Sequence, residues 1–399
     1  MKILFRRIHL YLGLTAGLVI LTCCLTGAIL VFEKDLQMAM NKKRYYVELS
    51  KTRLSIDQLI KNVKQNFPEG KVNGVKIYDD PRRSSEVNIN FSPKKDIKTK
   101  QEWPSKKETR QPERQPGYTI FVNPYTGAIL EKYSYRETFF YKVFSLHRWL
   151  LGSEKSAGKY IVGVSTFIFL FILITGIILW WPATKNILRQ RLKIKGNAGW
   201  KRMNHDLHIV FGFYSAIFLF IIAFTSLAWS FEWFNKGIYK LTNSPLKNPA
   251  PPKSAYIEGA KRITFDQSLS GAKTFYPNAV FYSLTMPKDS SETVNIMALN
   301  KNAAHEAATD VLYIDQYSGK VLGKLEYKDR SLGARVRSTF KPVHTGSIGG
   351  TPTKIIAFIV CLFGASFPVT GIIMWMNRVR KKRKKSAHDL IIEEEARRA

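Results

Sequence analysis

Four long apolar stretches constrain the fold of this chain more than any other feature. They lie near residues 8–32, 160–182, 207–233 and 354–376, and a helix needs about 20 apolar residues to cross a bilayer. The first stretch is longer than the apolar region of a secretory signal, and no convincing small-residue cleavage site follows it. The sequence therefore predicts a multi-pass membrane protein in which all four stretches are retained as spans.

The basic residues predict how the chain is oriented. Of a formal net charge of +32, a large share lies in short segments beside the spans, at 2–7, 185–202 and 378–385. Short basic segments stay on the cytoplasmic side, so both termini and residues 183–203 are predicted there, and the two longer connections outside. Clustering beside spans indicates the lipid bilayer, and not nucleic acid, as the partner of these charges.

Cysteine usage excludes two classes of site. The chain has three cysteines, and all of them fall inside predicted spans: Cys23, Cys24 and Cys361. They form neither a disulfide framework nor a zinc-ligand pattern. We interpret them as small apolar packing residues.

An internal repeat relates residues 1–182 to residues 200–376. "HLYLG" at His9 matches "HIVFG" at His208, and "TGIILWW" at Thr175 matches "TGIIMWM" at Thr370. "SIDQLI" echoes "TFDQSL", and "NPYTGAIL" echoes "DQYSGKVL" in the segments between. Both halves start inside, so the repeat is parallel. The predicted fold class is membrane α-helical, a four-helix transmembrane bundle with two extracytoplasmic α+β domains.

Periodicity predicts the elements of the outer domains. Residues 54–67 have a helical apolar period, whereas 72–78 and 86–91 alternate as strands. Residues 118–130 read as a hairpin around an Asn-Pro/Thr-Gly turn, and the second half repeats this pattern at 279–286, 292–299 and 310–322. The polar segment 92–117 is predicted to be a long flexible loop.

These readings divide the chain into eight predicted segments. They are span 1 at 1–33, outer domain 1 at 50–135, an interfacial helix with span 2 at 137–182, a basic loop at 183–203, span 3 at 204–233, outer domain 2 at 255–328, span 4 with its preceding segment at 335–377, and a basic tail at 378–399.

Four histidines occupy repeat-related positions and are the candidate site residues. His9 and His208 open spans 1 and 3, whereas His147 and His344 precede spans 2 and 4. The orientation places the first pair near the cytoplasmic face and the second near the outer face. Imidazoles from facing helices are how a bundle holds haem iron, so the four are predicted to be axial ligands of two haem b groups. A single histidine at such a position more often has a structural role. The occurrence of four histidines in two repeat-related pairs favours the role of metal ligands.

Neighbouring residues leave details of these pairs open. His205 precedes His208 by one turn and is an alternative ligand, although its repeat partner is Arg6. His305 and His388 have no repeat partner and are predicted to be solvated. Four glycines near the histidines are expected to make room for a ring: Gly13, Gly212, Gly152 and Gly349.

The order of these motifs resembles a known family. Two "(N/D)-x-Y-(T/S)-G-x-(I/V)-L" signatures are similar to PepSY domains, and with four spans and "TGIILWWP" the whole chain resembles the PepSY-associated transmembrane family of iron-regulated membrane proteins. That family includes siderophore reductases that carry haem. The resemblance implies an oxidoreductase of the bacterial inner membrane, with its PepSY-like domains in the periplasm, that reduces a ferric siderophore or chelate on the periplasmic side to release iron. The chain has no nucleotide-binding or nucleophile motif in a credible context, so the electron donor is expected to be separate, a quinol or a cytoplasmic reductase, and no catalytic residue is assigned.

Two alternatives to reduction remain. PepSY domains also resemble protease propeptide modules, which favours a membrane-anchored binding module that regulates a peptidase or cell-envelope enzyme without haem. Transport of intact siderophore is weaker, because the spans lack midplane charges. For the reductase, the substrate is expected between the two PepSY-like units and above the outer pair, near a basic rim: Lys94, Lys95, Lys106, Lys107 and Arg110.

Overall fold

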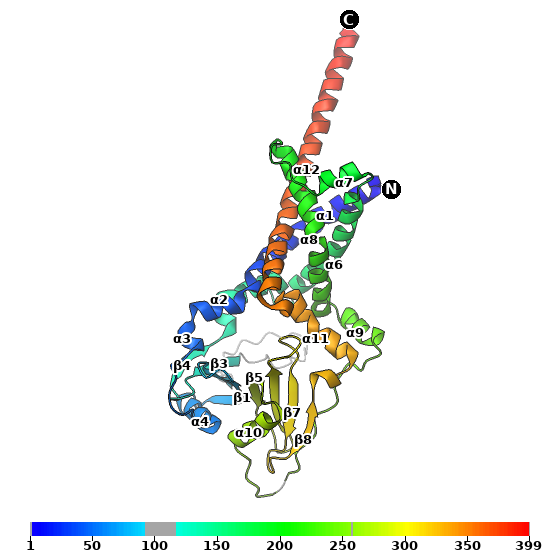
Figure 1. The fold of residues 1–399 in the computed structure, drawn as a ribbon. Coiled ribbons are helices and arrows are strands. Elements are labelled where there is room, and N and C mark those ends of the chain that lie inside the picture. The colour runs from blue at the N-terminus through cyan, green and yellow to red at the C-terminus, as the bar shows by residue number, and fades with distance from the viewer. Residues whose placement is uncertain (1, 92–116, 257, 399) are drawn as a thin grey trace, which may run out of the picture. The chain divides into compact units, whose positions relative to one another are not determined.

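The chain forms two compact units in the computed structural model, which describes residues 2–91, 117–256 and 258–398, with side chains to 381. The first unit combines residues 1–33, 142–242 and 336–399, and the second combines residues 34–141 and 243–335. Each unit therefore draws on both halves of the repeat. The chain is an α+β membrane protein with four long apolar helices and one eight-stranded antiparallel sheet (Figure 1).

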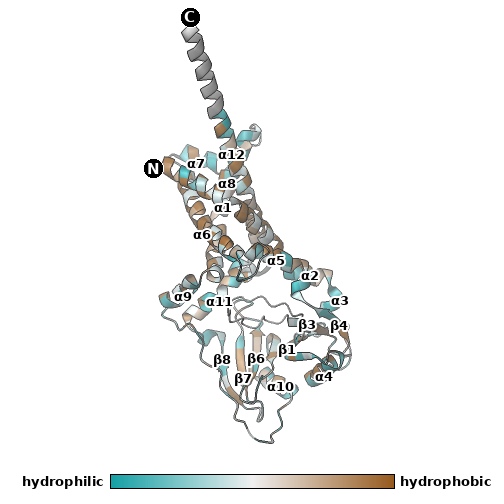
Figure 2. Cartoon of the chain, turned by 180° about the vertical axis from the view of Figure 1, so that it is seen from behind, coloured by the Kyte–Doolittle hydropathy of each residue, from teal (hydrophilic) through white to brown (hydrophobic). Residues whose placement is uncertain are grey.

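The four candidate spans are long helices of the first unit. They are α1 (Lys2–Val31), α6 (Ala157–Trp180), α8 (Trp200–Ser230) and α12 (Gly350–Arg398). Each of these helices contains a long apolar window, and brown segments mark apolar residues along the bundle in Figure 2. Large apolar side chains such as Leu18, Phe171 and Ile217 are exposed there, which suits helices that face lipid. The fourth helix runs beyond the predicted end of span 4 and includes the predicted basic tail.

These four helices close into a bundle. Both α1 and α8 pack against α6 and α12, so α1 and α8 occupy diagonal corners. Small residues allow close approach: a Cβ on Gly364 of α12 would lie 2.8 Å from the Cys24 sulfur of α1. Cys24 is buried in the apolar core of the bundle beside Ile20 and Leu219, and the three cysteines are free thiols.

Shorter helices flank the spans. Those of the first unit are α5 (Phe139–Trp149), which begins in the second unit, α7 (Lys185–Arg191), α9 (Glu232–Leu241) and α11 (Leu332–His344), which also begins in the second unit. After α5 the backbone turns through Leu150 and Leu151, whose φ angles of 51° and 66° are left-handed; after α11 it turns through Gly346 at 72°. The repeat therefore keeps a tight left-handed turn directly after each outer histidine helix.

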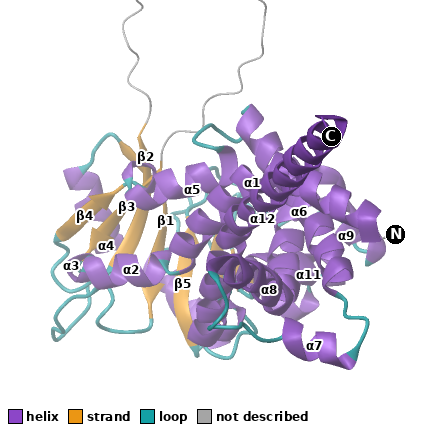
Figure 3. Ribbon diagram, turned by 90° about the horizontal axis from the view of Figure 1, so that it is seen from above, coloured by secondary structure: helices purple, strands orange, loops and turns teal. Residues whose placement is uncertain are grey.

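One continuous sheet organises the second unit (Figure 3). Its strands are β1 (Gly70–Tyr78), β2 (Ser85–Phe91), β3 (Gly117–Val122), β4 (Ile129–Tyr133), β5 (Ala279–Thr285), β6 (Val294–Asn300), β7 (Asp310–Ile314) and β8 (Val321–Leu325). The order is β4-β3-β2-β1-β5-β6-β7-β8, and β1 pairs with β5 in antiparallel register from Gly74↔Thr285 to Tyr78↔Phe281. The two outer domains predicted at 50–135 and 255–328 thus differ from the structure, where they share one sheet. Pairing the two inner edge strands removes two exposed rows of backbone hydrogen-bonding groups.

Two equivalent helices form a common core with the sheet. They are α4 (Ile56–Asn66) and α10 (Phe265–Phe275), and both start with a capping box, at Ser55 and at Thr264. Their apolar side chains meet those of the central strands, including Val75 and Leu284. The predicted helix at 54–67 and all the predicted strand segments match elements of this unit.

The N-termini of α4 and α10 cap each other. The Asp266 carboxylate accepts hydrogen bonds from the Ile56 and Asp57 amides at 3.0 and 3.4 Å. The Asp57 carboxylate accepts from the Phe265 and Asp266 amides at 3.0 and 3.4 Å. Burial and the neighbouring Asp266 carboxyl raise the pKa of Asp57. The same contact that joins the two repeats therefore brings two carboxyl groups together.

This reciprocal cap predicts a pH dependence. A raised pKa means that the folded state binds the Asp57 proton more tightly than the unfolded chain does, so stability should fall as pH rises from about 4 through the folded-state pKa. Asp57→Asn should flatten this dependence, because an amide oxygen still accepts but carries no charge. Asp57→Ala should cost about 1 kcal/mol through the lost caps. Hydrogen exchange in α4 and α10, corrected for the intrinsic effect of pH on exchange, measures the stability of this region at each pH. An equal pH dependence of that stability in the wild type and in Asp57→Asn would contradict the prediction.

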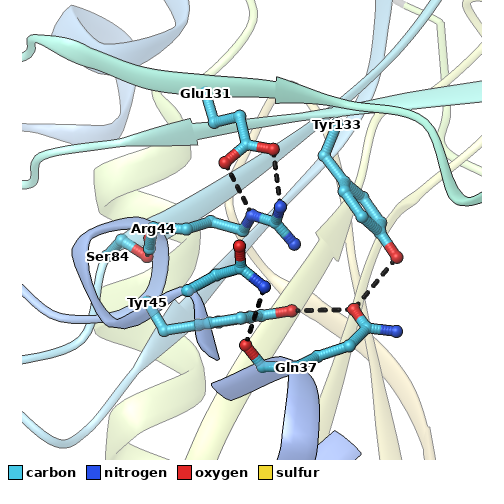
Figure 4. A network of polar contacts seen from close by, with 7 residues as sticks. Gln37, Arg44, Tyr45, Ser84, Glu131 and Tyr133 are labelled. Atoms are coloured by element: carbon cyan, nitrogen blue, oxygen red, sulfur yellow. Dashed lines mark hydrogen bonds and ion pairs between the residues drawn. The ribbon is translucent and has the colours of Figure 1, made fainter. Parts of the chain in front are cut away.

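Two small helices attach the second unit's N-terminal segment to the sheet. They are α2 (Glu33–Met40) and α3 (Lys42–Tyr45). Arg44 is 9% exposed and makes a bidentate ion pair with Glu131 of β4, at 2.8 and 2.6 Å, while the Gln37 side chain accepts from Tyr45 and Tyr133 (Figure 4). A bidentate guanidinium–carboxylate pair fixes orientation as well as distance.

Candidate functional site

The inner histidine pair meets across the bundle interior. His9 of α1 and His208 of α8 have ring centroids 6.4 Å apart with their planes at 84°. The two helices occupy diagonal corners of the bundle, so each side chain reaches inward from its own repeat. His9 Nδ1 lies 3.0 Å from the Thr175 hydroxyl of α6, and His208 Nδ1 lies 2.7 Å from the Thr370 hydroxyl of α12.

The outer pair repeats this arrangement with different partners. His147 at the end of α5 and His344 at the end of α11 have ring centroids 6.2 Å apart. His147 Nδ1 lies 3.0 Å from both the Cys23 carbonyl and the Thr26 hydroxyl of α1. His344 Nδ1 lies 2.9 Å from the Ile222 carbonyl of α8.

These partners determine which ring nitrogen carries the proton. A carbonyl oxygen only accepts, so Nδ1 of His147 and of His344 must donate. The Thr175 hydroxyl donates to the Phe171 carbonyl at 2.8 Å, and the Thr370 hydroxyl donates to the Ser366 carbonyl at 2.9 Å. Each hydroxyl has one proton, so its oxygen accepts from the inner histidine's Nδ1–H. All four imidazoles therefore present an unprotonated Nε2, which has a lone pair for a metal.

The environment of the outer pair keeps it neutral. Burial lowers the pKa of His147 and of His344, and the nearby Arg148 guanidinium lowers both further. Within the described residues, Nε2 of neither ring has a hydrogen-bond partner. A neutral imidazole with Nδ1 engaged is the form that ligates metals.

The spacing of each pair suits one metal ion between two rings. An imidazole nitrogen binds a metal at about 2 Å. The centre of an imidazole ring lies about 1.1 Å from its nitrogen, so two rings on opposite sides of one ion place their centroids about 6.3 Å apart. The observed 6.4 and 6.2 Å agree with that value. No group of three or more His, Cys, Asp or Glu side chains suited to a metal occurs among the described residues.

Glycines on the neighbouring helices give the imidazoles room. A Cβ on Gly27, Gly176 or Gly371 would lie 3.3 to 3.5 Å from Cε1 of His147, His9 or His208 respectively. The 3.3 Å contact of Gly176 with His9 is tighter than ordinary packing, and the other two are ordinary van der Waals contacts, so side chains larger than alanine at these positions would push the rings away.

The glycines predicted from the sequence have other surroundings. The space beside Gly13 and Gly212 is open to at least 4 Å, whereas Gly152 faces Ser156 and Gly349 faces Thr353. The expected role of Gly152 and Gly349 beside the outer pair is therefore wrong. Both lie in the loops after α5 and α11, where the chain has already turned away from the histidine.

The positions that support the histidines share a Thr-Gly signal. Thr175–Gly176 and Thr370–Gly371 hold the inner rings, and Thr26–Gly27 holds His147. The fourth equivalent position is Thr225–Ser226, where the ring is held by the Ile222 carbonyl instead. These threonines lie at equivalent positions of the two repeats. Their contacts with the histidines could not be predicted, because each threonine and its histidine lie on different helices that meet only in the packed bundle. A search for Thr-Gly at repeat-related span positions would have found them.

The remaining histidines lie elsewhere. His205 is half-exposed and its Nδ1 lies 3.3 Å from the Asp206 carboxylate, one residue along the same helix. His305, which was predicted to be solvated, is buried in the second unit, and its Nε2 lies 2.9 Å from the Tyr327 hydroxyl. The side chain of His388 and the basic rim predicted at Lys94, Lys95, Lys106, Lys107 and Arg110 lie outside the described residues.

Substitution of His208 and of His205, the two candidate ligands of the inner pair, should have different effects. His208→Ala should abolish ligand binding at the inner pair, because this ring alone faces His9 at 6.4 Å. His205→Ala should leave it nearly unchanged and mainly release the Asp206 contact. Optical spectra of the two variants, purified under the same conditions, measure the difference. A larger loss in His205→Ala would move the ligand by one helical turn.

Comparison with known protein families gives a match over most of the chain. The family described as PepSY-associated TM region matches residues 6–378. No curated protein matches the chain.

Proposed function

Because this chain belongs to the PepSY-associated TM region family, we propose that it is a di-haem electron-transfer protein of the bacterial inner membrane. In this proposal His9 and His208 hold one haem b, and His147 and His344 hold the other. The protein reduces a ferric siderophore or chelate on the periplasmic side, and iron is released. The repeat-related arrangement of both pairs in one bundle is the reason for assigning two groups and not one.

A single observation supports the proposal most strongly. The rings of each pair have the centroid spacing that one metal ion held between two imidazoles would need, and every Nδ1 is engaged so that Nε2 is the free nitrogen. A packing role for buried histidines does not require four rings to adopt one tautomer in two matched pairs. Metal-ligating histidines almost always donate their other N–H to such a partner.

Haem, when bound, supplies one-electron chemistry. The chain's own residues supply position and environment. Thr26, Thr175 and Thr370 set the direction of three rings, and the glycines beside them keep the rings close to the helices. The apolar core of the bundle lies beside the imidazoles, since Phe367, which packs against that core, has its ring centroid 5.6 Å from that of His208. These are the contributions that a protein makes to a cofactor reaction.

The two pairs lie at different depths along the bundle. Thr26, which contacts His147, follows His9 in the same helix by 17 residues. At 1.5 Å per residue this separates the pairs by about 25 Å, most of the thickness of a hydrocarbon core. The arrangement suits electron movement from a donor on one side, a quinol or a cytoplasmic reductase, to an acceptor on the other. Each ferric centre takes one electron and becomes Fe(II), which hard oxygen chelators bind less strongly than Fe(III).

The decisive experiment measures pigment. Protein purified after haem-replete expression should contain two haems per chain by the pyridine haemochrome assay, with a Soret band in its spectrum. A ratio near one would mean that one pair is not a site. Colourless protein would overturn the proposal and leave the membrane-anchored module that regulates a peptidase or envelope enzyme.

A second experiment tests the substrate and the side of reaction. Reduced protein in sealed proteoliposomes of known orientation is mixed with ferric chelates that cannot cross lipid. Chelates on the side of the eight-stranded sheet unit should reoxidise the protein. Reoxidation only from the opposite side would reverse the proposed direction, and no reoxidation by any ferric chelate would remove ferric reduction from the proposal.

A further inference from the structure

Two arginines gather beside the outer histidine pair. Trp229 near the end of α8 lies 5.5 Å from the His344 ring, centroid to centroid. The Arg337 guanidinium lies over the Trp229 ring at 4.9 Å, and Arg148 Nη2 lies 3.5 Å from the Trp229 carbonyl. Both guanidiniums are half-buried and come from the helices that carry the histidines, α5 and α11.

Neither arginine has a carboxylate within ion-pair distance among the described residues. Arg337 Nε donates to the Asn235 amide oxygen at 2.6 Å, and within the part of the chain that the structure describes Arg148 makes one hydrogen bond, the long contact to the Trp229 carbonyl. A guanidinium has five N–H donors, so most of them are unused in both cases. Glu154 acts on Arg148 only from beyond ion-pair distance, and a charge taken out of water is destabilising unless an opposite charge compensates it. The pattern indicates that an anion is part of this site.

The chemistry of a guanidinium pair narrows the choice of anion. Arginine binds planar carboxylates through two parallel N–H···O bonds. Haem carries two carboxylates at one edge of its ring, and both guanidiniums contact Trp229, which lies beside the His344 ring. We propose that Arg148 and Arg337 bind the carboxylates of the group held by His147 and His344 and thereby set its orientation. This inference rests on the proposed function.

The same carboxylate chemistry has another possible source, a free carboxylate ligand such as an anionic chelate. The two sources differ in one respect. Carboxylates of the cofactor contribute to how tightly the cofactor is held, whereas a free ligand adds to the site afterwards. A comparison of haem with its dimethyl ester, which has the same ring without the charges, separates them.

The experiment uses the full chain in detergent, freed of haem and reconstituted with haem or with haem dimethyl ester. Transfer to excess apomyoglobin then gives the dissociation rate from each pair. For the wild type, the ester should leave the outer pair at least about tenfold faster than haem does, since charge-assisted hydrogen bonds are strong. Arg148→Gln with Arg337→Gln should accelerate haem loss similarly and abolish the difference between haem and ester.

Controls distinguish charge from folding. Arg189→Gln removes an exposed positive charge of α7 and should change neither rate. Arg148→Lys and Arg337→Lys should keep part of the discrimination between haem and ester. The double glutamine variant should also lower the midpoint potential of the outer group only, because an adjacent positive charge favours the reduced, less positive form.

Each outcome decides the question. Equal dissociation of haem and ester from the wild-type outer pair overturns the inference, and this measurement needs no variant to fold. If haem and ester leave the wild type equally fast while citrate slows reoxidation of the reduced protein by ferric chelates, the arginines bind a free carboxylate. The assignment of the arginines to the cofactor is then wrong. Wild-type protein that takes up no haem at all overturns the proposed function itself.

Discussion

His147→Ala is expected to lower the haem content from two per chain to one. The loss should be confined to the outer pair, because His147 and His344 face each other at 6.2 Å, whereas the inner pair depends on other helices. Truncation leaves one imidazole for one iron and opens a hole in an otherwise packed site. The haemochrome assay gives the ratio, and low-temperature spectra show which α-band remains.

A matched variant separates ligand loss from general damage. His305 is also buried and hydrogen-bonded, but it lies in the sheet unit and contacts Tyr327. His305→Ala should therefore keep both haems. Unchanged spectra in His147→Ala would mean that the outer pair is not a site, and loss of both haems in His147→Ala would mean that the two pairs do not bind independently.

The inner pair should be sensitive to two hydroxyl groups that never touch a metal. Thr175→Val and Thr370→Val each remove the acceptor for an imidazole Nδ1–H while keeping the shape of the side chain. Loss of such a supporting partner typically weakens metal binding by about 10- to 100-fold. Haem transfer to apomyoglobin, followed at the inner α-band, measures this effect.

The control for this prediction lies in the same helix. Thr166 of α6 donates to the Val162 carbonyl at 2.8 Å, as Thr175 donates to its own helix. Because Thr166 has no histidine partner among the described residues, Thr166→Val should change haem affinity little. Equal effects of Thr166→Val and Thr175→Val would show that the hydroxyl acts on the helix and not on His9.

Much of the architecture was accessible from local patterns. Spans 1 to 3 were predicted close to α1, α6 and α8, because about 20 consecutive apolar residues have few other structures available. Periods of two and of 3.6 residues gave the strands and α4, since these periods reflect which side chains share one face. The histidines were found because the repeat displays them at equivalent positions.

Other features depended on contacts between distant segments. The union of the two outer domains rests on pairing of β1 with β5, which are about 200 residues apart and carry no signal for each other. The glycines that touch imidazoles lie on neighbouring helices at Gly27, Gly176 and Gly371, whereas proximity in sequence had pointed to Gly152 and Gly349. Spacing along one helix reports on one face of that helix only.

The sequence by itself determined the membrane class, the repeat and the identity of the four histidines, because each follows from composition or from a comparison of the chain with itself. The tertiary structure decided which rings face each other, which nitrogen of each ring is protonated, and which arginines stand beside the outer pair. The physical reason is that hydrogen-bond partners such as Thr175 for His9 are 166 residues away, and only packing of the helices brings a donor and its acceptor within 3 Å.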